Sequence, residues 1–548
     1  MSNPDIKMHV RGESIFVDDI SPPDSTLYAV IFTSPEAKGI IKRLDVSKAQ
    51  LCRGVKAVFT AKDVPGQNQI GHIIKDQPLF AVDKVEYIGE PIALVVAVTR
   101  EEAFDALKHI EIDVEKLKPI LDPREAFDRN ELIQGPRCVI LGDVESAWAK
   151  CSTIIEGRAD SAGQEHFYFE TQGAMAVPSE GGNVKIYASS QAPGGYHHSI
   201  ADVLGVPMHQ VEIDIRRLGG GFGGKEACAL WAAMPAMAAK LLGRPVKLVL
   251  SRHEDIATTG KRHPFSTDFK MGIDKDYNII AYQAKFFQDA GAYADISTAV
   301  LERCMLHAVG SYKIPNVRID VVSCRTNTLP NTAMRGFGVP QATFAIESAI
   351  YKTAQKLNIH PSVIQKKNLL AEGDMFHYEM KTENCSAIRC WEELDNRYGI
   401  GKRIDKVCEF NRTHKAEKRG IAVQPVCFGI SFTQTSLNQA GALVHIYIDG
   451  SVGISTGAVE MGQGVNSKIM LVASQVMSIG VDRIRMETTN TTRVANASPT
   501  SASTGSDLNG MAVNKACECL VARLREFIAG KLSAKIGEVK IKDEMVYL

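Results

Sequence analysis

The chain has 548 residues, of which 45% are hydrophobic and 23% charged, and its 63 lysine and arginine residues balance 63 aspartate and glutamate residues. This length predicts several domains, and the balanced charge argues against a nucleic-acid partner, because a phosphate-binding face needs an excess of basic residues. The N-terminal residues lack the features of a secretory signal, and the longest weakly polar run, 227–239, is too short to span a bilayer. We therefore expect a cytoplasmic protein with no membrane partner.

Twelve cysteines are spread along the chain without a C-x-x-C pair. Their spacing fits neither a zinc site nor an iron–sulfur site. We expect reduced thiols that serve as small apolar side chains, and no iron–sulfur cluster bound by this chain.

The predicted elements in the first part of the chain form a mixed unit of strands and one helix. Residues 92–98 are a continuous apolar run, typical of a buried strand, and residues 100–110 follow with helical spacing. The segment 117–123, which contains prolines, predicts a linker, so we place a first boundary near residue 125. A second boundary is predicted near 400, because charged residues crowd the region around it and a new strand begins at 442–448.

From residue 150 onward, loops rich in glycine or small polar residues lead four times into a predicted helix, the first time after a strand at 211–216. The four loops cover 219–224, 335–341, 460–465 and 503–506, and the helices cover 227–242, 342–357, 466–477 and 512–532. Such loops bring backbone N–H groups close to a ligand, and a helix N-terminus adds partial positive charge. We expect a large, elongated, anionic ligand. The alternative is that the loops are only tight turns between packed elements.

The segment from Gly219 to Lys225 nearly satisfies the P-loop motif G-x-x-x-x-G-K-[ST]. The motif requires a hydroxyl after the lysine to bind Mg²⁺, but Glu226 stands there, and its carboxylate would repel a triphosphate. An NTPase is therefore not predicted. We expect Lys225 and Glu226 at the rim of a cofactor pocket, with a solvated carboxylate in a first helical turn as the alternative for Glu226.

Seven motifs then occur in an order that is similar to the large molybdopterin-binding module of xanthine dehydrogenases and aldehyde oxidases. They are Gln164–Glu170, Gly219–Glu226, Arg262–Phe265, Ala333–Gly338, Phe428–Phe432, Leu437–Gly441 and Glu460–Gly464. The resemblance covers residues 5 to 530, nearly the whole chain. It implies an α+β fold: an N-terminal α/β hammerhead-like subdomain at 1–125 and two elongated molybdopterin-binding α+β subdomains at 126–400 and 401–548, the second incomplete.

The resemblance also implies a site for molybdenum held by molybdopterin. The residues that match cofactor-binding positions are Gln191, Phe222, Gly223, Arg335, Gln463 and Ala502. Four of them match the shell around the metal, mostly without direct ligation: Gln191, Phe222, Arg335 and Ala502. The cytosine dinucleotide form of the pterin stays open.

The resemblance further implies a purine substrate such as xanthine or hypoxanthine. Phe337 and Phe432 match two rings that hold a flat heterocycle between them, which suits a purine physically. Glu226 and Arg303 match the polar pair on the purine edge, and Thr433 matches the neighbouring hydroxyl. Considered singly, each phenylalanine is more often a core residue and Arg303 more often a surface ion-pair residue.

The implied reaction is a hydroxylation with oxygen derived from water and hydride transfer to the molybdenum centre. The electrons would leave through [2Fe–2S] clusters and FAD on partner subunits. A molybdenum hydroxylase for another N-heterocycle or an aldehyde stays open, as does an inactive truncated remnant.

A general-base glutamate is not identified in the sequence. In the family it lies late in the module, in a Gly-Glu or Gly-Glu-Pro motif. Glu90, in Gly89-Glu90-Pro91, matches a strand entry of the first subdomain, and Glu538 lies in a lysine-rich tail, so neither is assigned as the base. We expect the base beyond residue 548 or on a second molybdenum-binding chain, and therefore no activity from this chain alone.

Overall fold

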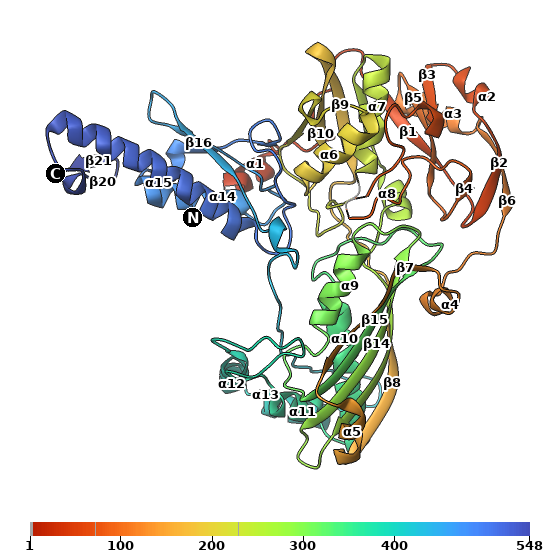
Figure 1. Cartoon of the computed structure of the whole chain (residues 1–548), viewed down its shortest axis with the longest axis vertical. Helices are drawn as coiled ribbons and strands as arrows, with labels where there is room; N and C mark the ends of the chain where they lie inside the picture. The colour runs from red at the N-terminus through yellow and green to blue at the C-terminus, as the bar shows by residue number, and fades with distance from the viewer. Residues whose placement is uncertain (1–3, 72, 228) are drawn as a thin grey trace.

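The computed structural model describes residues 4–71, 73–227 and 229–548, and it places the two largest sheets in an upper and a lower lobe (Figure 1). The upper sheet has eight strands. In spatial order they are β19 (Thr489–Asn490), β11 (Val211–Ile215), β10 (Asn183–Ala188), β9 (Gly173–Ser179), β12 (Val246–Val249), β1 (Leu27–Thr33), β5 (Pro91–Ala97) and β3 (Val55–Thr60). With the helices described below, this arrangement confirms a mixed α+β fold.

Strand β5 illustrates why the upper sheet is buried on both faces. All seven of its residues are buried. Because side chains alternate across a strand, Leu94 and Val96 join one hydrophobic core while Ala93, Val95 and Ala97 join another. The predicted strand at 92–98 and the helix after it, α3 (Arg100–Leu107), are confirmed within a few residues.

The upper sheet connects all three predicted units of the chain. Strand β1, from the first unit, pairs in parallel with β12 through Leu27 and Val246. Strand β19, from the third unit, pairs with β11 through Asn490 and Asp214. The rest of the first unit includes a smaller sheet with the order β4 (Lys84–Val85), β2 (Gly39–Asp45) and β6 (Glu111–Lys116). The boundaries near 125 and 400 stay predictions.

The lower lobe is built on a five-stranded sheet. Its strands lie in the order β7 (Leu132–Leu141), β15 (Asn316–Arg325), β14 (Ile279–Gly291), β13 (Phe265–Ile273) and β8 (Thr153–Ser161). Helix α10 (Val339–Leu357) packs on β8 and β13, and α9 (Ser297–Leu306) packs on β15. The helix predicted at 342–357 is thus confirmed, with Pro340 in its first turn.

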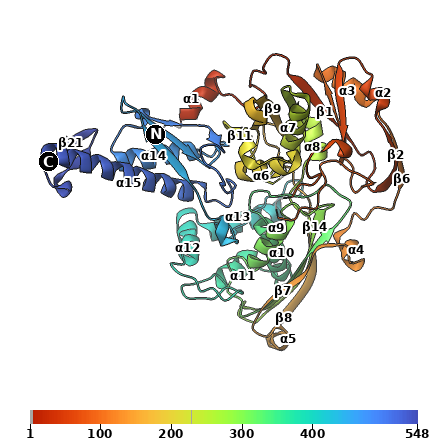
Figure 2. The ribbon, with the colours of Figure 1, turned by 45° about the horizontal axis from the view of Figure 1, so that its top comes forward.

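The last part of the chain forms a small sheet covered by two helices. The sheet has the order β16 (Ala442–Ile446), β17 (Val452–Thr456) and β18 (Ile484–Met486), and the helices are α14 (Val465–Met477) and α15 (Gly505–Leu532). Both views show α15 projecting away from the two large sheets (Figures 1 and 2). The predicted start of this helix at 512 is wrong by seven residues, because packing on α14 overrides the weak helix propensity of its glycine and polar residues.

The remaining elements are mostly short. They are α1 (Pro4–Arg11), α2 (Ser47–Gln50), α4 (Pro123–Asp128), α5 (Val144–Ala147), α6 (Pro193–Leu204), α7 (Leu230–Leu242), α8 (Arg252–Thr258), α11 (Pro361–Lys367), α12 (Ala387–Tyr398), α13 (Ile400–Thr413), β20 (Lys540–Lys542) and β21 (Met545–Tyr547). Between α13 and β16 the chain runs through an extended segment whose one helical element is a single 3-10 turn at Thr435–Leu437. Among the described residues, no helix is long and apolar enough to cross a membrane.

Glu90 acts as a structural carboxyl group at the entry to β5. It is 1% exposed, accepts a hydrogen bond of 2.6 Å from the Tyr293 hydroxyl at Oε1, and accepts another of 2.6 Å from the Glu86 backbone N–H at Oε2. Burial raises its pKa to about 7. Glu538, in contrast, is exposed in a 3-10 turn near the C-terminus. Neither residue lines the pocket described below.

We predict that Glu90→Ala destabilises the protein by about 1–3 kcal/mol, because it leaves a buried tyrosine hydroxyl and a partly buried N–H without an acceptor. Thermal melting followed by circular dichroism measures the effect, and Glu538→Ala is the matched control that should melt like the parent. Equal melting temperatures for the two variants would contradict the structural role of Glu90.

Candidate functional site

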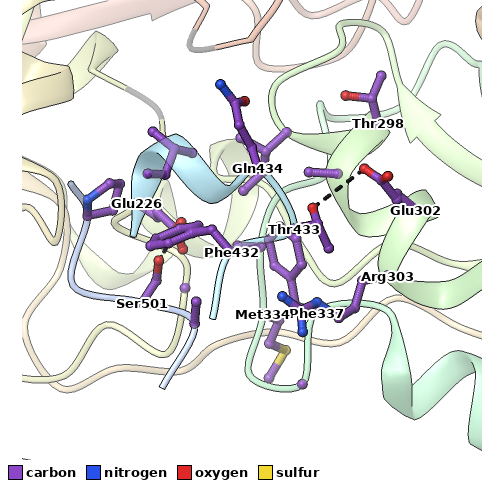
Figure 3. A pocket seen from close by; sticks show the side chains of 18 of the residues that line it. Glu226, Thr298, Glu302, Arg303, Met334, Phe337, Phe432, Thr433, Gln434 and Ser501 are labelled. Atoms are coloured by element: carbon purple, nitrogen blue, oxygen red, sulfur yellow. Dashed lines mark hydrogen bonds between the residues drawn. The ribbon is translucent and has the colours of Figure 1, made fainter. Parts of the chain in front are cut away.

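Ten of the eleven residues predicted for cofactor or substrate binding line one pocket of about 430 Å³, a size typical of small-molecule sites. They are Gln191, Phe222, Gly223, Glu226, Arg303, Arg335, Phe337, Phe432, Thr433 and Ala502. Figure 3 labels Glu226, Arg303, Phe337, Phe432 and Thr433 among the side chains that line the cavity. Their roles remain predictions, but their convergence is a property of the fold.

The Gln191 amide joins the loops that form the pocket. It is 3% exposed, its Oε1 accepts a hydrogen bond of 2.9 Å from Gly223 N–H, and its Nε2 donates one of 3.2 Å to the Thr500 carbonyl. The Thr500 N–H donates in return to the Gln191 carbonyl at 2.9 Å. One residue thus connects the loop 219–226 with the loop 498–503.

Several residues of the same loops have strained backbone conformations. Phe222, Phe337 and Ala502 adopt left-handed φ values of 55°, 50° and 54°. Gly223 has a φ of +105°, and a Cβ there would lie 2.7 Å from the Ala333 carbonyl oxygen, so this position requires glycine. The Arg335 N–H donates to the Phe222 carbonyl at 2.8 Å, which locks two of these loops together. Such conformations persist only where the surroundings enforce them, and they cluster at functional sites.

Gln463 is the one predicted residue that does not line the pocket. It is exposed and binds within its own loop, since its Nε2 donates to the Val459 carbonyl at 2.9 Å. The loop itself lies next to the loops that line the pocket, because Val459 N–H donates to Thr500 Oγ1 at 2.9 Å and Leu218 N–H donates to the Glu460 carbonyl at 2.8 Å.

Three N–H donors at the start of α14 are already bound within the protein. The Glu460 carboxylate accepts hydrogen bonds from the N–H groups of Gly462, Gly464 and Asn466 at 2.9–3.1 Å. The helix N-terminus is therefore already neutralised by an internal carboxylate. A glycine-rich pattern does not reveal such a competitor. Equally, the loop at 219–224 does not lead directly into a helix, because α7 begins only at Leu230.

Lys225 and Glu226 are both buried, although we expected both at the rim of the pocket. The expectation is wrong for Lys225, which does not line the pocket, and Glu226 lies in the pocket wall instead of at its rim. The Lys225 ammonium is fully buried and pairs with Glu170 at 3.1 Å, away from the cavity. Glu226 is 8% exposed and lines the pocket wall rather than a solvated helix turn. Burial raises the pKa of its carboxyl group to about 7, a hydrogen bond from Ser501 opposes this rise, and the charge of Asp295 adds to it.

The pocket strap, residues 428–433, forms the wall that carries Phe432 and Thr433. It is held from α9 rather than by a sheet. Both terminal nitrogens of Arg303 donate to strap carbonyls, those of Gly429 and Ser431. One turn later, His307 Nε2 accepts a hydrogen bond of 3.0 Å from Gly429 N–H while its Nδ1 lies 2.9 Å from the Arg303 carbonyl. Since Nε2 must accept, the imidazole is neutral, and burial lowers its pKa.

Several pocket residues were missed by the sequence reasoning. Glu302 accepts a hydrogen bond of 3.5 Å from the Thr433 hydroxyl (Figure 3). It also lies 3.7 Å from Arg137, so the three residues form a polar edge of the pocket. Ser501 also lines the pocket, and His307 supports its wall. A partial signal existed: Glu302 and Ser501 adjoin predicted residues, and His307 follows Arg303 at helical spacing.

The residues present fit a pterin cofactor of the expected kind. Loops from both halves of the chain converge through Gln191 and Thr500, as an elongated group that bridges them requires. The guanidinium of Arg335 is exposed at the pocket and, among the described residues, makes no hydrogen bond or ion pair, so it is available to an anionic group.

Comparison with known proteins assigns the chain to a family. Two family models, each described as a molybdopterin cofactor-binding domain, match residues 128–369 and 393–548, and the aldehyde oxidase and xanthine dehydrogenase a/b hammerhead domain matches residues 11–118. The chain belongs to the xanthine dehydrogenase and aldehyde oxidase family. The resemblance seen in the sequence motifs is thereby confirmed.

Individual members of the family are similar over nearly the whole chain. The xanthine dehydrogenase/oxidase of Gallus gallus is 40% identical over 94% of this chain, and the xanthine dehydrogenase of Oryza sativa subsp. japonica is also 40% identical over 94%. The chain spans 38% of the length of each of these relatives.

Solved structures share the fold of this family member at lower identity. Quinoline 2-oxidoreductase from Pseudomonas putida 86 superposes with a TM-score of 0.88 at 20% identity, covering 100% of this chain and 73% of that chain. Aldehyde oxidoreductase from Desulfovibrio gigas gives a TM-score of 0.85 at 23% identity, covering 100% and 64%.

We predict that the buried Glu226 makes this xanthine dehydrogenase relative less stable as the pH rises. Between about pH 4.5 and 7 the folded state keeps a proton that the unfolded chain releases, so the free energy of unfolding falls with increasing pH, by about 3 kcal/mol for one such group. Glu226→Gln should therefore gain melting temperature relative to the parent across this window. Glu90 and Asp295 titrate in the same range but are present in both proteins, so a pH-independent difference would contradict the prediction.

We also predict that His307→Leu loosens the pocket strap. Loss of one hydrogen bond of about 1.4 kcal/mol should speed amide exchange of the Gly429 region about ten-fold. Hydrogen–deuterium exchange of peptides covering 426–434 measures this. His307→Gln, whose side-chain oxygen can accept from Gly429 N–H, is the matched control and should retain most of the protection. Unchanged exchange in the leucine variant would show that the strap does not depend on His307.

Proposed function

We propose that this chain is the molybdenum-cofactor-binding subunit, or part, of an oxidoreductase that hydroxylates a purine. The observation that carries the proposal is the single pocket in which Glu226 and Arg303 meet Phe337 and Phe432 beside the loops of the cofactor site. The relatives named xanthine dehydrogenase, at 40% identity, support it.

Each part of the pocket suits a flat, polar heterocycle. Phe337 and Phe432 offer aromatic faces to a planar ring. Glu226 offers a hydrogen-bonding group at the ring edge. Arg303 holds the strap, and its positive charge lies beside the cavity, where it would stabilise negative charge that develops on the ring.

We propose that Gln191, Arg335 and the main chain at Phe222, Gly223 and Ala502 hold the cofactor. When bound, molybdopterin-held molybdenum supplies the two-electron redox chemistry of a hydroxylation whose oxygen derives from water. Partner subunits with [2Fe–2S] clusters and FAD would accept the electrons. Of the acidic pocket residues, Glu226 is bound to Ser501, and Glu302 lies against Arg137 and Thr433, so neither is assigned as the general base. That the general base is a residue other than Glu226 and Glu302 stays a prediction.

The second candidate is a hydroxylase for another N-heterocycle or for an aldehyde. Solved structures named quinoline 2-oxidoreductase and aldehyde oxidoreductase have this fold, so the fold alone does not select a substrate. The carboxyl group of Glu226 and the guanidinium group of Arg303 favour a purine. A purine ring has two polar ring atoms that could contact both groups, whereas an aldehyde group has none.

We predict that the purified chain contains molybdenum and pterin and binds xanthine without turning it over alone. Elemental analysis, pterin fluorescence and isothermal titration calorimetry measure these properties. Glu226→Val should weaken xanthine binding at least about ten-fold while the molybdenum content stays unchanged, since one hydrogen bond to a charged group is lost. Arg335→Ala should lower the molybdenum and pterin content, and Glu538→Ala should change neither property. Absence of both molybdenum and pterin, or turnover by the isolated chain, would contradict the proposal.

A further inference from the structure

A hydrogen bond between side chains connects the two halves of the chain inside the pocket. Ser501 Oγ, from the loop that precedes α15, donates to Glu226 Oε1 at 2.9 Å. Glu226 comes from the loop after β11, and a dashed line in Figure 3 joins the two side chains. Both residues line the pocket.

The two carboxyl oxygens of Glu226 therefore have different surroundings. Oε1 is bound by the Ser501 hydroxyl, whereas Oε2 has no hydrogen-bond partner among the described residues. Since Glu226 lines the cavity, Oε2 is the oxygen left for a bound molecule. The hydrogen bond from Ser501 thus leaves only Oε2 of the carboxyl group to contact a bound molecule.

Burial and the charge of Asp295 raise the pKa of Glu226, in the opposite direction to Ser501. Asp295, between β14 and α9, is 7% exposed, accepts from Thr332 Oγ1 at 2.8 Å, and its negative charge raises the pKa of Glu226. Lys225, the next residue in the sequence, points away to Glu170, and Arg303 across the pocket is bound to the strap. The Ser501 hydroxyl, by donating to Oε1, lowers the pKa that burial and Asp295 raise.

We propose that Ser501 is a positioning residue that determines which ring edge the pocket selects, by holding Glu226 as a hydrogen-bond acceptor. An ionised carboxylate accepts a hydrogen bond from a ring N–H, whereas a neutral carboxyl group donates to an unprotonated ring nitrogen. With Ser501 in place, the pocket prefers heterocycles that present an N–H to Oε2. Without it, the preference moves toward heterocycles that present a bare ring nitrogen.

This inference rests on the proposed function for its ligand class but not for its first test. Infrared spectra of the parent minus Glu226→Gln, recorded across a pH series, isolate the carboxyl band of Glu226 and give its pKa without any ligand or cofactor chemistry. Subtracting the spectra of the double variants, in which Glu226→Gln is combined with Ser501→Ala or with Ser501→Thr, from those of the single serine variants gives the pKa of Glu226 in each serine variant. We expect a higher pKa in the alanine variant and a nearly unchanged pKa in the threonine variant, which retains the hydroxyl.

The second test compares two probes that differ at the ring nitrogen and at the carbon beside it; the carbon differs in the same way for every variant, so a change in the ratio between variants reports on the nitrogen. In the lactam form, 2-quinolone presents a ring N–H, whereas quinoline presents a bare nitrogen at the same position. Calorimetry near neutral pH gives the ratio of their dissociation constants for each protein. We expect Ser501→Ala to shift this ratio about ten-fold toward quinoline, the effect of one hydrogen bond to a charged group, and Ser501→Thr to leave it nearly unchanged.

The two tests separate failure of this inference from failure of the proposed function. An unchanged Glu226 pKa in a Ser501→Ala protein that melts normally overturns the positioning role. A raised pKa with an unchanged probe ratio overturns the role in selection. If neither probe nor xanthine binds the parent, the proposed function fails and the selection role fails with it, while the infrared titration alone decides the positioning role.

Discussion

The side-chain amide of Gln191 is the contact on which the site depends. Its oxygen and nitrogen bind two loops that are far apart in the sequence, at Gly223 and Thr500, and the backbone of Thr500 binds back to Gln191. An amide suits this position because it donates and accepts at once without bringing a charge into a buried place. This contact and the hydrogen bond from Ser501 to Glu226 both join the first molybdopterin-binding unit to the last part of the chain at the pocket wall.

The pocket walls are irregular backbone held by specific partners. Phe222 and Phe337 have left-handed conformations, and the strap around Gly429 is held by Arg303 and His307 in place of strand neighbours. The left-handed conformations and the lack of strand neighbours lower the local stability, and the packing of the surrounding sheets compensates for this loss. In return, side chains from distant segments face one cavity, which regular elements alone would not achieve.

Buried charge is arranged differently on the two sides of the same loop. Lys225 is compensated by Glu170 within the protein interior, so it contributes to structure. Glu226, one residue later, has the neutral Ser501 hydroxyl as its hydrogen-bond partner among the described residues, and burial, together with the charge of Asp295, raises the pKa of its carboxyl group to about 7. Groups perturbed in this way tend to lie at functional sites, and this contrast supports Glu226 as a recognition group.

The sequence by itself determined the family, the α+β class and several of the helices and strands, because local periodicity and motif order are properties of neighbouring residues. Strand β5 and helix α10 are examples whose limits differ from expectation by only a few residues. It also brought Glu226, Arg303, Phe337 and Phe432 together as a set, although only through the resemblance.

Only the tertiary structure decided which partners these residues have. Glu460 occupies the helix donors that glycine spacing left open, Ser501 binds Glu226 across the two halves of the chain, and Arg303 binds the strap. The sheet that connects all three predicted units could not be foreseen either, since Leu27 and Val246 pair over a long separation in sequence. Local patterns specify what a segment is, whereas a hydrogen bond or a buried charge depends on which distant segment packs against it.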